Sequence, residues 1–545
     1  MRVRVHTCPQ PRHAEHAAVK FKSRLRVYKR EASKLTAMGN FFEDLVHTVM
    51  ESTLTEEEQD ALKAKFHKLR RDVIEDVRNI FPHGQILEPG LPALPDVMEA
   101  YATYVNNELP TYLVHVPEKR LVSRQEVKKM YRRDLMAVTE ADITKVVEEA
   151  AGRSVPTREE AIKALVKGKL KYATFSHRWL ERGEPSFRDI LMSFRPAGYS
   201  KLVNFCEKAA EYDCCLAWSD TCCINKDSST ELEEAIRSMF KWYRDAHACI
   251  AYLAEATSIE DLGKDVWFTR GWTLQELLAP RTMKFYGKDW VPLTSSINDK
   301  QDVRMLDALS RATGIPHRDL RCFRPGTRDV HQKMMWASNR TTTRVEDIAY
   351  SLIGIFDVSL TIAYGEGHRA FYRLMETIVN RCGEWEIMAW AGRPSADSAA
   401  LPESPRCYRA LGEAGTETQS GVSGNNGLTR RTWRGDGNFI MTKQGLQLKL
   451  LVVDLPSPSI KLFEGAGRKG VESTRNGKCT VGVVNYWCFD TSGQGVLRPG
   501  QDHLCLLLRS DPFDPYAEWE KVSTTELLFV RTDIDVKKEL SMLWL

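Results

Sequence analysis

Apolar and polar positions follow three different patterns along this chain of 545 residues, and the first pattern is helical. From Leu62 to Ile80, apolar residues recur every three or four positions until Pro82, as on one face of an amphipathic helix. A capping pair, formed by a Thr and an acidic residue three positions later, marks the start of this helix and of two later ones. Residues 40–168 are therefore predicted to form a helical N-terminal region. The pairs are Thr55 with Glu58, Thr139 with Asp142, and Thr157 with Glu160.

From residue 169 the pattern changes to short, nearly continuous apolar runs that alternate with amphipathic stretches. The short runs predict buried strands, and the stretches between them predict helices. Strands that alternate with helices form a parallel sheet with right-handed crossovers. We therefore predict an α/β domain over 169–385, with a helical extension at its C-terminal end. The predicted strands are 170–176, 214–220, 248–253 and 282–287, and the predicted helices are 199–212, one beginning at Ser228, and 269–279.

The third pattern lies at the C-terminal end, where apolar segments that alternate with polar residues are separated by Gly, Pro, Ser and Asp. This pattern predicts a small β-rich domain over 428–545. Residues 386–427 are predicted to be a linker, because they include a stretch rich in Gly, Ser and Asn at 415–427. The chain has no phosphate-binding loop motif and no periodic repeat. The short segment Gly365–Gly367 is expected to be a turn that precedes a helix over 368–378.

Composition excludes several classes of protein. The net charge of +4 is too small to indicate a nucleic acid or an anionic membrane as the partner. No apolar run approaches the roughly 20 residues that a membrane helix needs, so we expect a cytoplasmic protein. Residues 1–30 hold nine basic residues against one acidic residue, Glu15, which predicts a disordered basic tail over 1–39 or a mitochondrial presequence.

The thirteen cysteines are scattered and include two adjacent pairs, Cys214–Cys215 and Cys222–Cys223. Neither pair has the spacing of a zinc site, and adjacent residues of a strand point to opposite faces. We therefore expect free thiols that pack in the interior, and no bound metal.

The segment Asp265–Pro280 combines two tryptophans with an arginine and a carboxylate, a mixture that an ordinary surface helix does not need. If Thr269 caps a helix here, Trp272 and Glu276 lie four residues apart on one face. Burial beside the indole would raise the pKa of Glu276 and suit it to catalysis. The alternative is a structural ion pair between Glu276 and Arg270.

Several polar residues follow the first two predicted strands directly. Ser176, His177 and Arg178 end the first strand, and Asp220 ends the second. Because ligands bind beyond the carboxyl ends of parallel strands, we expect these residues to meet at one sheet edge, where Glu276 can join them. A Ser–His nucleophile is not expected, since neighbouring residues of a strand face opposite ways.

Three ordered blocks, KYATFSHRW, LAWSDTCCIN and WFTRGWTLQELLAP, resemble the fungal heterokaryon incompatibility (HET) domain. The resemblance covers about residues 170–380 and includes the downstream segment at 345–374. This chain departs from the family pattern at Leu180, where glycine is frequent, at Asn225, where aspartate is common, and near Thr361, where the family has proline. Leu180 matters most, because a glycine there would allow a tight turn beside the site.

The resemblance implies a role in the cell death that follows fusion of incompatible fungal cells. It also implies a TIR-like, flavodoxin-like parallel sheet flanked by helices. Some TIR domains hydrolyse NAD⁺ with a glutamate in a W-C-x-x-E helix, and this chain has W-T-L-Q-E, with Thr273 in place of the cysteine. Two functions follow as alternatives. One is an NAD⁺-cleaving effector, and the other is a non-enzymatic module that self-associates and recruits protein partners.

For NAD⁺ cleavage, the resemblance suggests a role for each residue of the predicted site. Glu276 would be the catalytic carboxylate that stabilises an oxocarbenium-like ribose. The rest of the site would bind substrate, and NAD⁺ would be a substrate with no separate cofactor. In this hypothesis Trp272 or Trp179 stacks on a ring, Arg178 and Arg270 meet phosphates, Asp220 holds a hydroxyl, and Ser176 and His177 orient the ligand.

Overall fold

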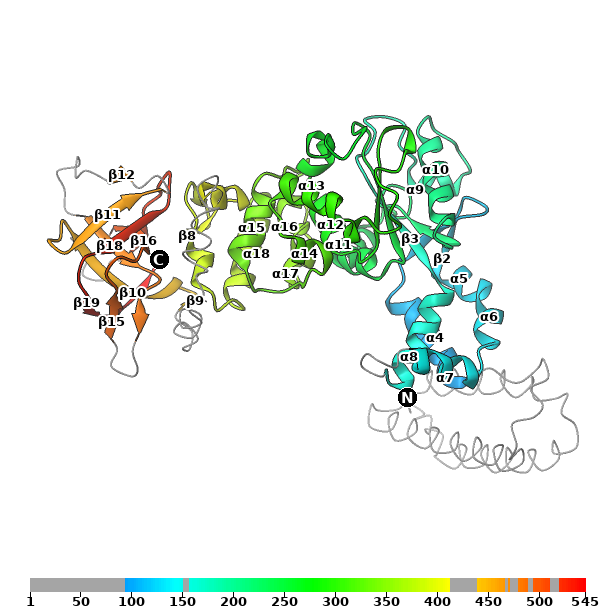
Figure 1. Cartoon of the computed structure of the whole chain (residues 1–545), viewed down its shortest axis with the longest axis horizontal. Helices are drawn as coiled ribbons and strands as arrows, with labels where there is room; N and C mark the ends of the chain where they lie inside the picture. The colour runs from blue at the N-terminus through cyan, green and yellow to red at the C-terminus, as the bar shows by residue number, and fades with distance from the viewer. Residues whose placement is uncertain are drawn as a thin grey trace, which may run out of the picture. The chain divides into compact units, whose positions relative to one another are not determined.

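The computed structural model describes residues 94–149, 156–411, 439–465, 469–470, 479–488, 494–509 and 519–545 (Figure 1). The predicted basic tail, the predicted helix from Leu62 to Ile80 and the Gly/Ser/Asn-rich stretch at 415–427 lie outside these residues. The chain divides into two compact units. The described part of the first unit is 94–102, 131–149 and 156–166, and the second unit holds 103–130 and everything from residue 167 onward.

The first unit is helical, and both capping pairs predicted in its described part are present. The amide of Thr139 donates to Asp142 Oδ2 (2.8 Å) at the start of α7, and the amide of Thr157 donates to Glu160 Oε2 (2.8 Å) at the start of α8. Each acidic residue also donates its own amide to the threonine hydroxyl. The helices that contribute to this unit are α4 (Pro95–Asn107), α6 (Arg132–Met136), α7 (Glu140–Glu149) and α8 (Arg158–Lys169).

The second unit is built on a six-stranded sheet with the strand order β2-β1-β4-β3-β5-β6. The four strands predicted from the sequence are present and parallel, which confirms the α/β architecture. Each is short and almost entirely buried, as the continuous apolar runs indicated. These strands are β3 (Tyr172–His177), β4 (Leu216–Trp218), β5 (Ala248–Tyr252) and β6 (Met283–Tyr286).

Two further strands, β1 (Tyr112–His115) and β2 (Arg120–Ser123), extend the sheet antiparallel beyond β4. The sequence analysis expected only helices in this region and missed both strands. Each strand has four residues with two buried apolar positions in its centre, which is too short for the period of a strand to stand out. Strand β2 pairs with β1, and β1 pairs with β4, which lies about a hundred residues away in the chain.

Helices pack on the sheet through the faces that the sequence predicted. Helix α10 (Tyr199–Ala210) buries Leu202, Phe205, Cys206 and Ala209. Helix α11 (Ser229–Asp245) is capped by Ser228, whose hydroxyl accepts from the Glu231 amide. Two buried tyrosines fix α11 to β3: Tyr172 donates to the Trp242 carbonyl (2.6 Å), and Tyr243 donates to the Phe175 carbonyl (2.8 Å).

A helical extension follows the sheet, as predicted. It comprises α13 (Val303–Thr313), α14 (His317–Arg321), α15 (Val330–Ser338), α16 (Asp347–Tyr350), α17 (Ile353–Phe356) and α18 (Arg369–Val379). Gly354 of α17 lies directly against the Phe240 ring of α11, with no room for a Cβ. The turn at Gly365 and Gly367 is confirmed: both amides donate to Glu346 Oε1, at 2.8 and 3.1 Å, before α18 begins.

The described part of the predicted linker, residues 386–411, is folded, so that part of the prediction is wrong. It contains η6 (Trp385–Met388), β7 (Pro394–Ser395), β8 (Ser398–Pro402) and η7 (Pro405–Leu411). Trp390, Leu401 and Tyr408 are each at most 2% exposed. Because these side chains bury a large apolar area, the segment gains enough free energy to be ordered despite its many Gly, Pro and Ser residues.

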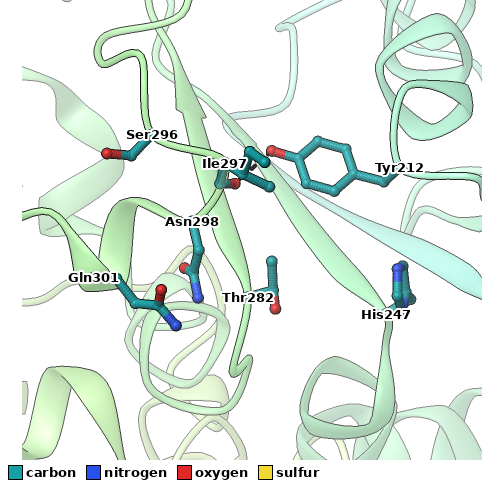
Figure 2. Close-up of a pocket in the computed structure, with 7 residues that line it drawn as sticks. All are labelled: Tyr212, His247, Thr282, Ser296, Ile297, Asn298 and Gln301. Carbon is teal, nitrogen blue, oxygen red and sulfur yellow. Dashed lines mark hydrogen bonds between the residues drawn. The ribbon is translucent and has the colours of Figure 1, made fainter.

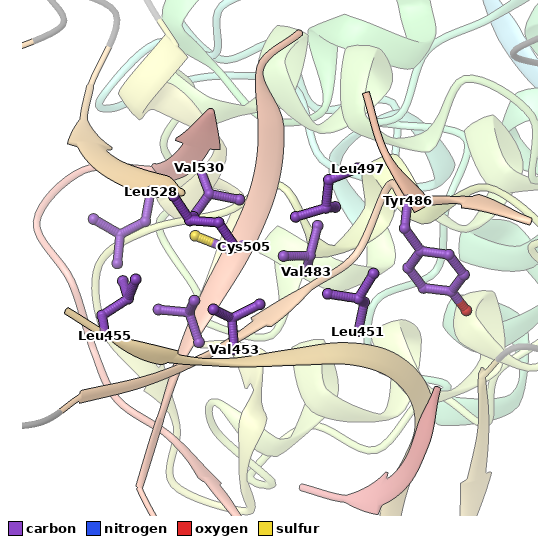
Figure 3. Close-up of a cluster of buried hydrophobic side chains, with 11 residues drawn as sticks. Leu451, Val453, Leu455, Val483, Tyr486, Leu497, Cys505, Leu528 and Val530 are labelled. Carbon is purple, nitrogen blue, oxygen red and sulfur yellow. The ribbon is translucent and has the colours of Figure 1, made fainter. Parts of the chain in front are cut away.

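The C-terminal region is β-rich and antiparallel, as predicted, with a nine-stranded and a three-stranded sheet among its described residues. Leu451 and Val453 of β10 pack with Val483 of β13 and Val530 of β18 in a single buried cluster (Figure 3). The strands are β9 (Phe439–Thr442), β10 (Gly445–Leu455), β11 (Ile460–Glu464), β12 (Lys469–Gly470), β13 (Cys479–Val483), β14 (Trp487–Cys488), β15 (Gln494–Leu497), β16 (His503–Arg509), β17 (Glu520–Lys521), β18 (Leu528–Thr532), β19 (Val536–Glu539) and β20 (Ser541–Trp544).

Candidate functional site

A buried chain of hydrogen bonds joins β3 to the segment that carries Glu276. The Ser176 hydroxyl donates to Glu276 Oε2 at 2.5 Å, and Trp267 Nε1 donates to the Ser176 oxygen at 2.9 Å. Ser176 and Trp267 are completely buried, and Glu276 is only 4% exposed. The sequence analysis placed Ser176 and Glu276 together at the carboxyl edge of the sheet, and the structure brings them into direct contact. It did not foresee Trp267 as the second donor.

The helix that carries Glu276 begins later than predicted. Residues Val266–Thr269 form a 3-10 turn (η3), and α12 runs only from Thr273 to Leu278. Thr269 is therefore not the cap; its hydroxyl donates to the Val266 carbonyl. Asp265 caps the turn instead, accepting from the Trp267 amide at 2.9 Å. The extra turn explains why Trp267, and not Trp272, points its indole N–H at Ser176.

Trp272 and Glu276 bond to different parts of the protein, although they are four residues apart. Trp272 is the N-cap residue of α12, and its indole hydrogen-bonds Asp347, at the start of α16. Glu276 bonds instead to β3. Within the described residues, no salt bridge joins Glu276 to Arg270, so the alternative of a direct ion pair is not realised either. The stacking of Trp272 against the catalytic carboxyl that the sequence suggested is therefore replaced by the link from Trp267 through Ser176.

Burial dominates the electrostatics of Glu276. It raises the pKa of Glu276 to about 8, and the negative charge of Asp220 adds to the effect. The Ser176 hydrogen bond and the positive charges of Arg270 and Arg340 act in the opposite direction. The direction predicted from the sequence is confirmed. A carboxyl with this pKa is mostly protonated at neutral pH, so it is a proton donor there and not a fixed negative charge.

Arg340 is a residue of this network that the sequence analysis missed. Its Nη1 donates to the Arg270 carbonyl (2.8 Å) and to Thr273 Oγ1 (2.9 Å), while the Thr273 hydroxyl donates to the Trp267 carbonyl (2.5 Å). Burial lowers the pKa of Arg340 to about 9, and the field of Glu276 partly offsets this. Thr273 and Arg340 are 67 residues apart, so no local motif signals their contact.

Thr273 takes the place of the cysteine in the likeness to a W-C-x-x-E helix that the sequence suggested, and its hydroxyl is used fully in this structure. It accepts from Arg340 and also lies 3.0 Å from the Arg270 carbonyl. A backbone bridge supports the same joint, because Gly271 donates to the Thr341 carbonyl (2.8 Å) and Thr341 donates to the Thr269 carbonyl (2.7 Å). The substitution therefore ties the start of α12 to the helical extension.

Asp220 accepts a hydrogen bond from Trp179, which was predicted to stack on a ring of the substrate. The Trp179 indole donates to Asp220 Oδ2 at 2.8 Å, and Lys226 Nζ lies 3.9 Å from the centre of the indole ring. Burial lowers the pKa of Lys226, against the pull of Asp220. Trp179 is 39% exposed, so its ring is accessible beside the carboxylate whose charge acts on Glu276.

His177 belongs to a separate buried group. Its Nε2 lies 3.2 Å from Glu184 Oε1, and its ring stacks on Phe175 at 3.9 Å. Lys201 completes the group, donating to Glu184 (3.1 Å) and to the Arg178 carbonyl (2.7 Å). Burial, followed by the charge of Lys201, lowers the pKa of His177. Burial opposes ionisation of Glu184, but the hydrogen bond from His177 and the charges nearby outweigh it and lower its pKa to about 2. This group fixes the loop after β3.

The two arginines predicted to meet phosphates lie in different surroundings. Arg178 is exposed and pairs with Glu255 at 3.1 Å. Arg270 is half-buried, and its Nε has no hydrogen-bond partner among the described residues. Of the predicted set, three residues interact with Glu276 through a hydrogen bond or through their charge: Ser176, Asp220 and Arg270. Trp179 bonds Asp220, and His177 follows Ser176 on β3. Arg178 and Trp272 bond to other parts of the protein.

The cavities of the second unit lie away from Glu276. One of about 550 Å³ opens at the amino ends of β5 and β6, the edge opposite to Ser176 and Asp220, and Figure 2 shows its polar lining, which includes Tyr212, His247 and Asn298. A second, of about 380 Å³, is lined by Arg340 and other residues of the helical extension and by residues between 391 and 407. Neither cavity is lined by Glu276, so the described conformation keeps this carboxyl closed.

The thiols near the site are interior residues. Cys222 and Cys223 are buried, and the Cys223 sulfur accepts from the Ser219 amide. A hydrogen bond with Cys223, together with burial, raises the pKa of Cys222 well above its ordinary value. Cys214 is buried as well, whereas its neighbour Cys215 is exposed. In the described ranges, no group of three or more His, Cys, Asp or Glu side chains is placed to hold a metal ion. No helix in these ranges has the length and apolar character needed to cross a bilayer.

Comparison with known proteins agrees with the first two blocks seen in the sequence. The family described as "Heterokaryon incompatibility protein (HET)" matches residues 172–265, from the start of β3 to the cap of η3. The chain is 41% identical over 245 residues to the vegetative incompatibility protein HET-E-1 of Podospora anserina, an alignment that covers 42% of this chain and 17% of that protein. No solved structure matches the chain. Residues 172–265, which hold β3, β4 and β5 with Ser176 and Asp220 at the carboxyl edge of the sheet, therefore form a HET domain, and the chain is homologous to a segment of a vegetative incompatibility protein.

Proposed function

We propose that this chain is an effector of vegetative incompatibility, which triggers cell death after fusion with a non-self partner. Support comes from the HET match and from 41% identity to HET-E-1, although the chain spans only 17% of that relative. The shared segment includes β3, β4, β5 and the helix α11, which together position Ser176 and Asp220. The segment of β3, β4, β5 and α11 would therefore carry the effector function.

For the chemistry, we propose that the HET domain cleaves NAD⁺ with Glu276 as the reacting carboxyl. The observation that carries the proposal is a buried glutamate with a pKa of about 8 at the carboxyl edge of a parallel sheet. In this reaction the bond from ribose C1′ to the nicotinamide nitrogen breaks and water adds at C1′. The products are nicotinamide and ADP-ribose. An ionised Glu276 would stabilise the cationic ribose or take the proton of the attacking water.

Two properties of the site set conditions on this activity. Glu276 is closed to solvent, so substrate binding must displace part of its covering. The charged form is required, and because burial raises the pKa to about 8, this form is scarce at pH 6. The rate should therefore rise about tenfold per pH unit up to about pH 8 and then level off.

The experiment measures NAD⁺ loss and nicotinamide release by the full-length protein at high concentration. Glu276→Gln should lower the rate by on the order of 100-fold or more, as loss of one electrostatic stabiliser does. Glu233→Gln is the matched control, because Glu233 forms only a surface ion pair with Arg237 on α11. A folded Glu276→Gln protein that cleaves NAD⁺ at the normal rate would remove Glu276 from the reaction.

A second candidate function, recruitment through self-association, is favoured by the segment that follows β3, a loop with the short helix α9 (Phe187–Leu191). Between residues 179 and 194 this segment exposes five large apolar side chains, and exposed apolar surface is suited to contact with another protein. The sequence analysis named self-association as the alternative to catalysis, and this surface is suited to it. The exposed residues are Trp179 (39%), Leu180 (44%), Leu191 (59%), Met192 (67%) and Phe194 (61%).

Sedimentation of the full-length protein over a range of concentrations tests the second function. If the loop is the contact surface, the wild-type protein should associate and the double variant Leu191→Ser/Phe194→Ser should remain monomeric. The control variant Ile440→Ser changes an exposed apolar residue on β9, far along the chain. Killing by the Glu276→Gln protein in fungal cells, together with loss of killing by the loop variant, would select recruitment over catalysis.

A further inference from the structure

The cavity of about 380 Å³ beside Arg340 has a basic lining that neither proposed function uses. Its charged side chains are Arg340, Arg393 and Arg406, against a single acid, Glu403. His368, the N-cap residue of the eleven-residue helix α18, adds a further nitrogen and places a helix amino terminus beside the cavity. The volume is within the range of small-molecule sites, and the excess of guanidinium groups favours an anion.

Arg340 is the buried anchor of this cavity. It is 7% exposed, and it uses Nη1 for the Arg270 carbonyl and the Thr273 hydroxyl. Its other N–H groups form no hydrogen bond with the described part of the chain. A buried guanidinium is unfavourable without a counter-charge, and Glu276, the carboxyl whose field acts on Arg340, is mostly protonated at neutral pH. An anion in the cavity would supply that counter-charge.

The two rim arginines are held on folded backbone. The Arg393 carbonyl accepts from the Glu403 amide (3.0 Å) and from the Cys407 sulfur (3.2 Å), which fixes the turn that presents both side chains. The side chains of Arg393 and Arg406 are exposed, and they form no ion pair with any described residue. Three guanidinium groups, each able to donate two parallel hydrogen bonds, match the oxygens of a phosphate better than a single carboxylate does.

We propose that this cavity binds a small phosphate-bearing ligand and that Arg340 couples its occupancy to the helix of Glu276. The connection is direct, because the guanidinium that lines the cavity also bonds Thr273, the first residue of α12. The backbone bridge between Gly271 and Thr341, which also lines the cavity, provides a second connection. The site is independent of the proposed NAD⁺ chemistry and is present whichever of the two functions holds.

Titration calorimetry of the full-length protein with inorganic pyrophosphate tests the binding. We expect saturable binding in the wild type and affinity at least about tenfold weaker in Arg393→Gln/Arg406→Gln. The matched control is Arg409→Gln, an exposed arginine on the same element, η7, that does not line the cavity. Malonate at equal ionic strength should bind more weakly than pyrophosphate. Absence of saturable binding, equal weakening in the control, or equal affinity for malonate would each overturn the phosphate site.

Amide hydrogen exchange tests the coupling and needs no enzymatic readout. Pyrophosphate should slow exchange over residues 271–278 in the wild type. Arg340→Lys keeps the positive charge but removes the planar fork, so it should still bind pyrophosphate, more weakly, without slowing exchange in α12. If α12 does not respond in the wild type, or responds equally in Arg340→Lys, Arg340 does not transmit occupancy. Because no NAD⁺ assay is involved, these outcomes are separate from those of the proposed activity.

Discussion

The hydroxyl of Ser176 lies 2.5 Å from the carboxyl oxygen of Glu276, although the two residues are 100 positions apart in the chain. This contact joins the carboxyl end of β3 to the short helix α12, and both side chains are buried. Burial opposes the charge of Glu276 and the Ser176 hydroxyl partly stabilises it, which gives several measurable consequences.

The first prediction concerns stability against pH in Glu276→Gln. Burial raises the pKa of Glu276 from 4.5 to about 8, so between these values the folded protein binds more protons than the unfolded chain. Wild-type stability should therefore lose a contribution as the pH rises from 4.5 to 8, whereas the Gln variant does not titrate. The stability of the variant relative to wild type should increase by a few kcal/mol over this range, because one pKa unit corresponds to about 1.4 kcal/mol.

Urea unfolding of both proteins at pH 5 and pH 8.5 measures this difference. A difference in unfolding free energy that stays constant between the two pH values would show that Glu276 does not titrate in this range.

The second prediction concerns Ser176→Ala. The substitution removes the acceptor of Trp267 Nε1 and one donor to Glu276, which leaves the buried indole N–H of Trp267 without a partner. We expect a loss of about 1–3 kcal/mol in unfolding free energy and a further rise in the pKa of Glu276. Thermal melts should show the loss, and Ser258→Ala, whose hydroxyl bonds Asp261 near the surface, should melt close to wild type. Equal melting temperatures for the two variants would contradict the role of Ser176.

The third prediction concerns Thr273, the first residue of α12. Thr273→Val keeps the shape but leaves the Trp267 carbonyl and Arg340 without the hydroxyl, so it should cost about 1–3 kcal/mol. Thr273→Ser keeps the hydroxyl and should retain most of the stability. Chemical unfolding of the two variants measures the difference, and a valine variant as stable as the serine variant would show that the hydroxyl contributes nothing.

The fourth prediction concerns Gly354. A Cβ at this position would collide with the Phe240 side chain, so Gly354→Ala should lower stability by about 1–3 kcal/mol. Gly383→Ala is the control, because no atom lies within 4 Å of the position where its Cβ would be. Phe240→Leu in the Gly354→Ala background should recover part of the loss if the two side chains compete for one space. No recovery would indicate that the backbone at Gly354, and not the Phe240 ring, sets the requirement.

The sequence determined the elements that depend on local pattern. Strands β3 to β6 are continuous apolar runs, helix α11 has a cap at Ser228 and an apolar face, and both follow from residues close together in the chain. The order of strands and helices then placed Ser176 and Asp220 at the carboxyl edge. The raised pKa of Glu276 followed from its place among apolar neighbours.

Only the tertiary structure decided which groups meet. Trp272 is four residues from Glu276 and Trp267 is nine, yet a 3-10 turn directs the more distant Trp267 to Ser176 and leaves Trp272 to Asp347. Arg340 joins α12 from 67 residues away. A spacing pattern reports only neighbours within a few residues, so a contact of this range cannot be read from it.

The same reason explains the elements that the sequence analysis missed. Strands β1 and β2 have four residues each, too few to show a period, and they are ordered because β1 pairs with β4 and β2 with β1. Residues 386–411 have the composition of a linker, but burial of Trp390 and Tyr408 against the extension orders them. Local propensity sets which conformations a segment favours, and the apolar area it buries against distant partners decides whether it adopts them.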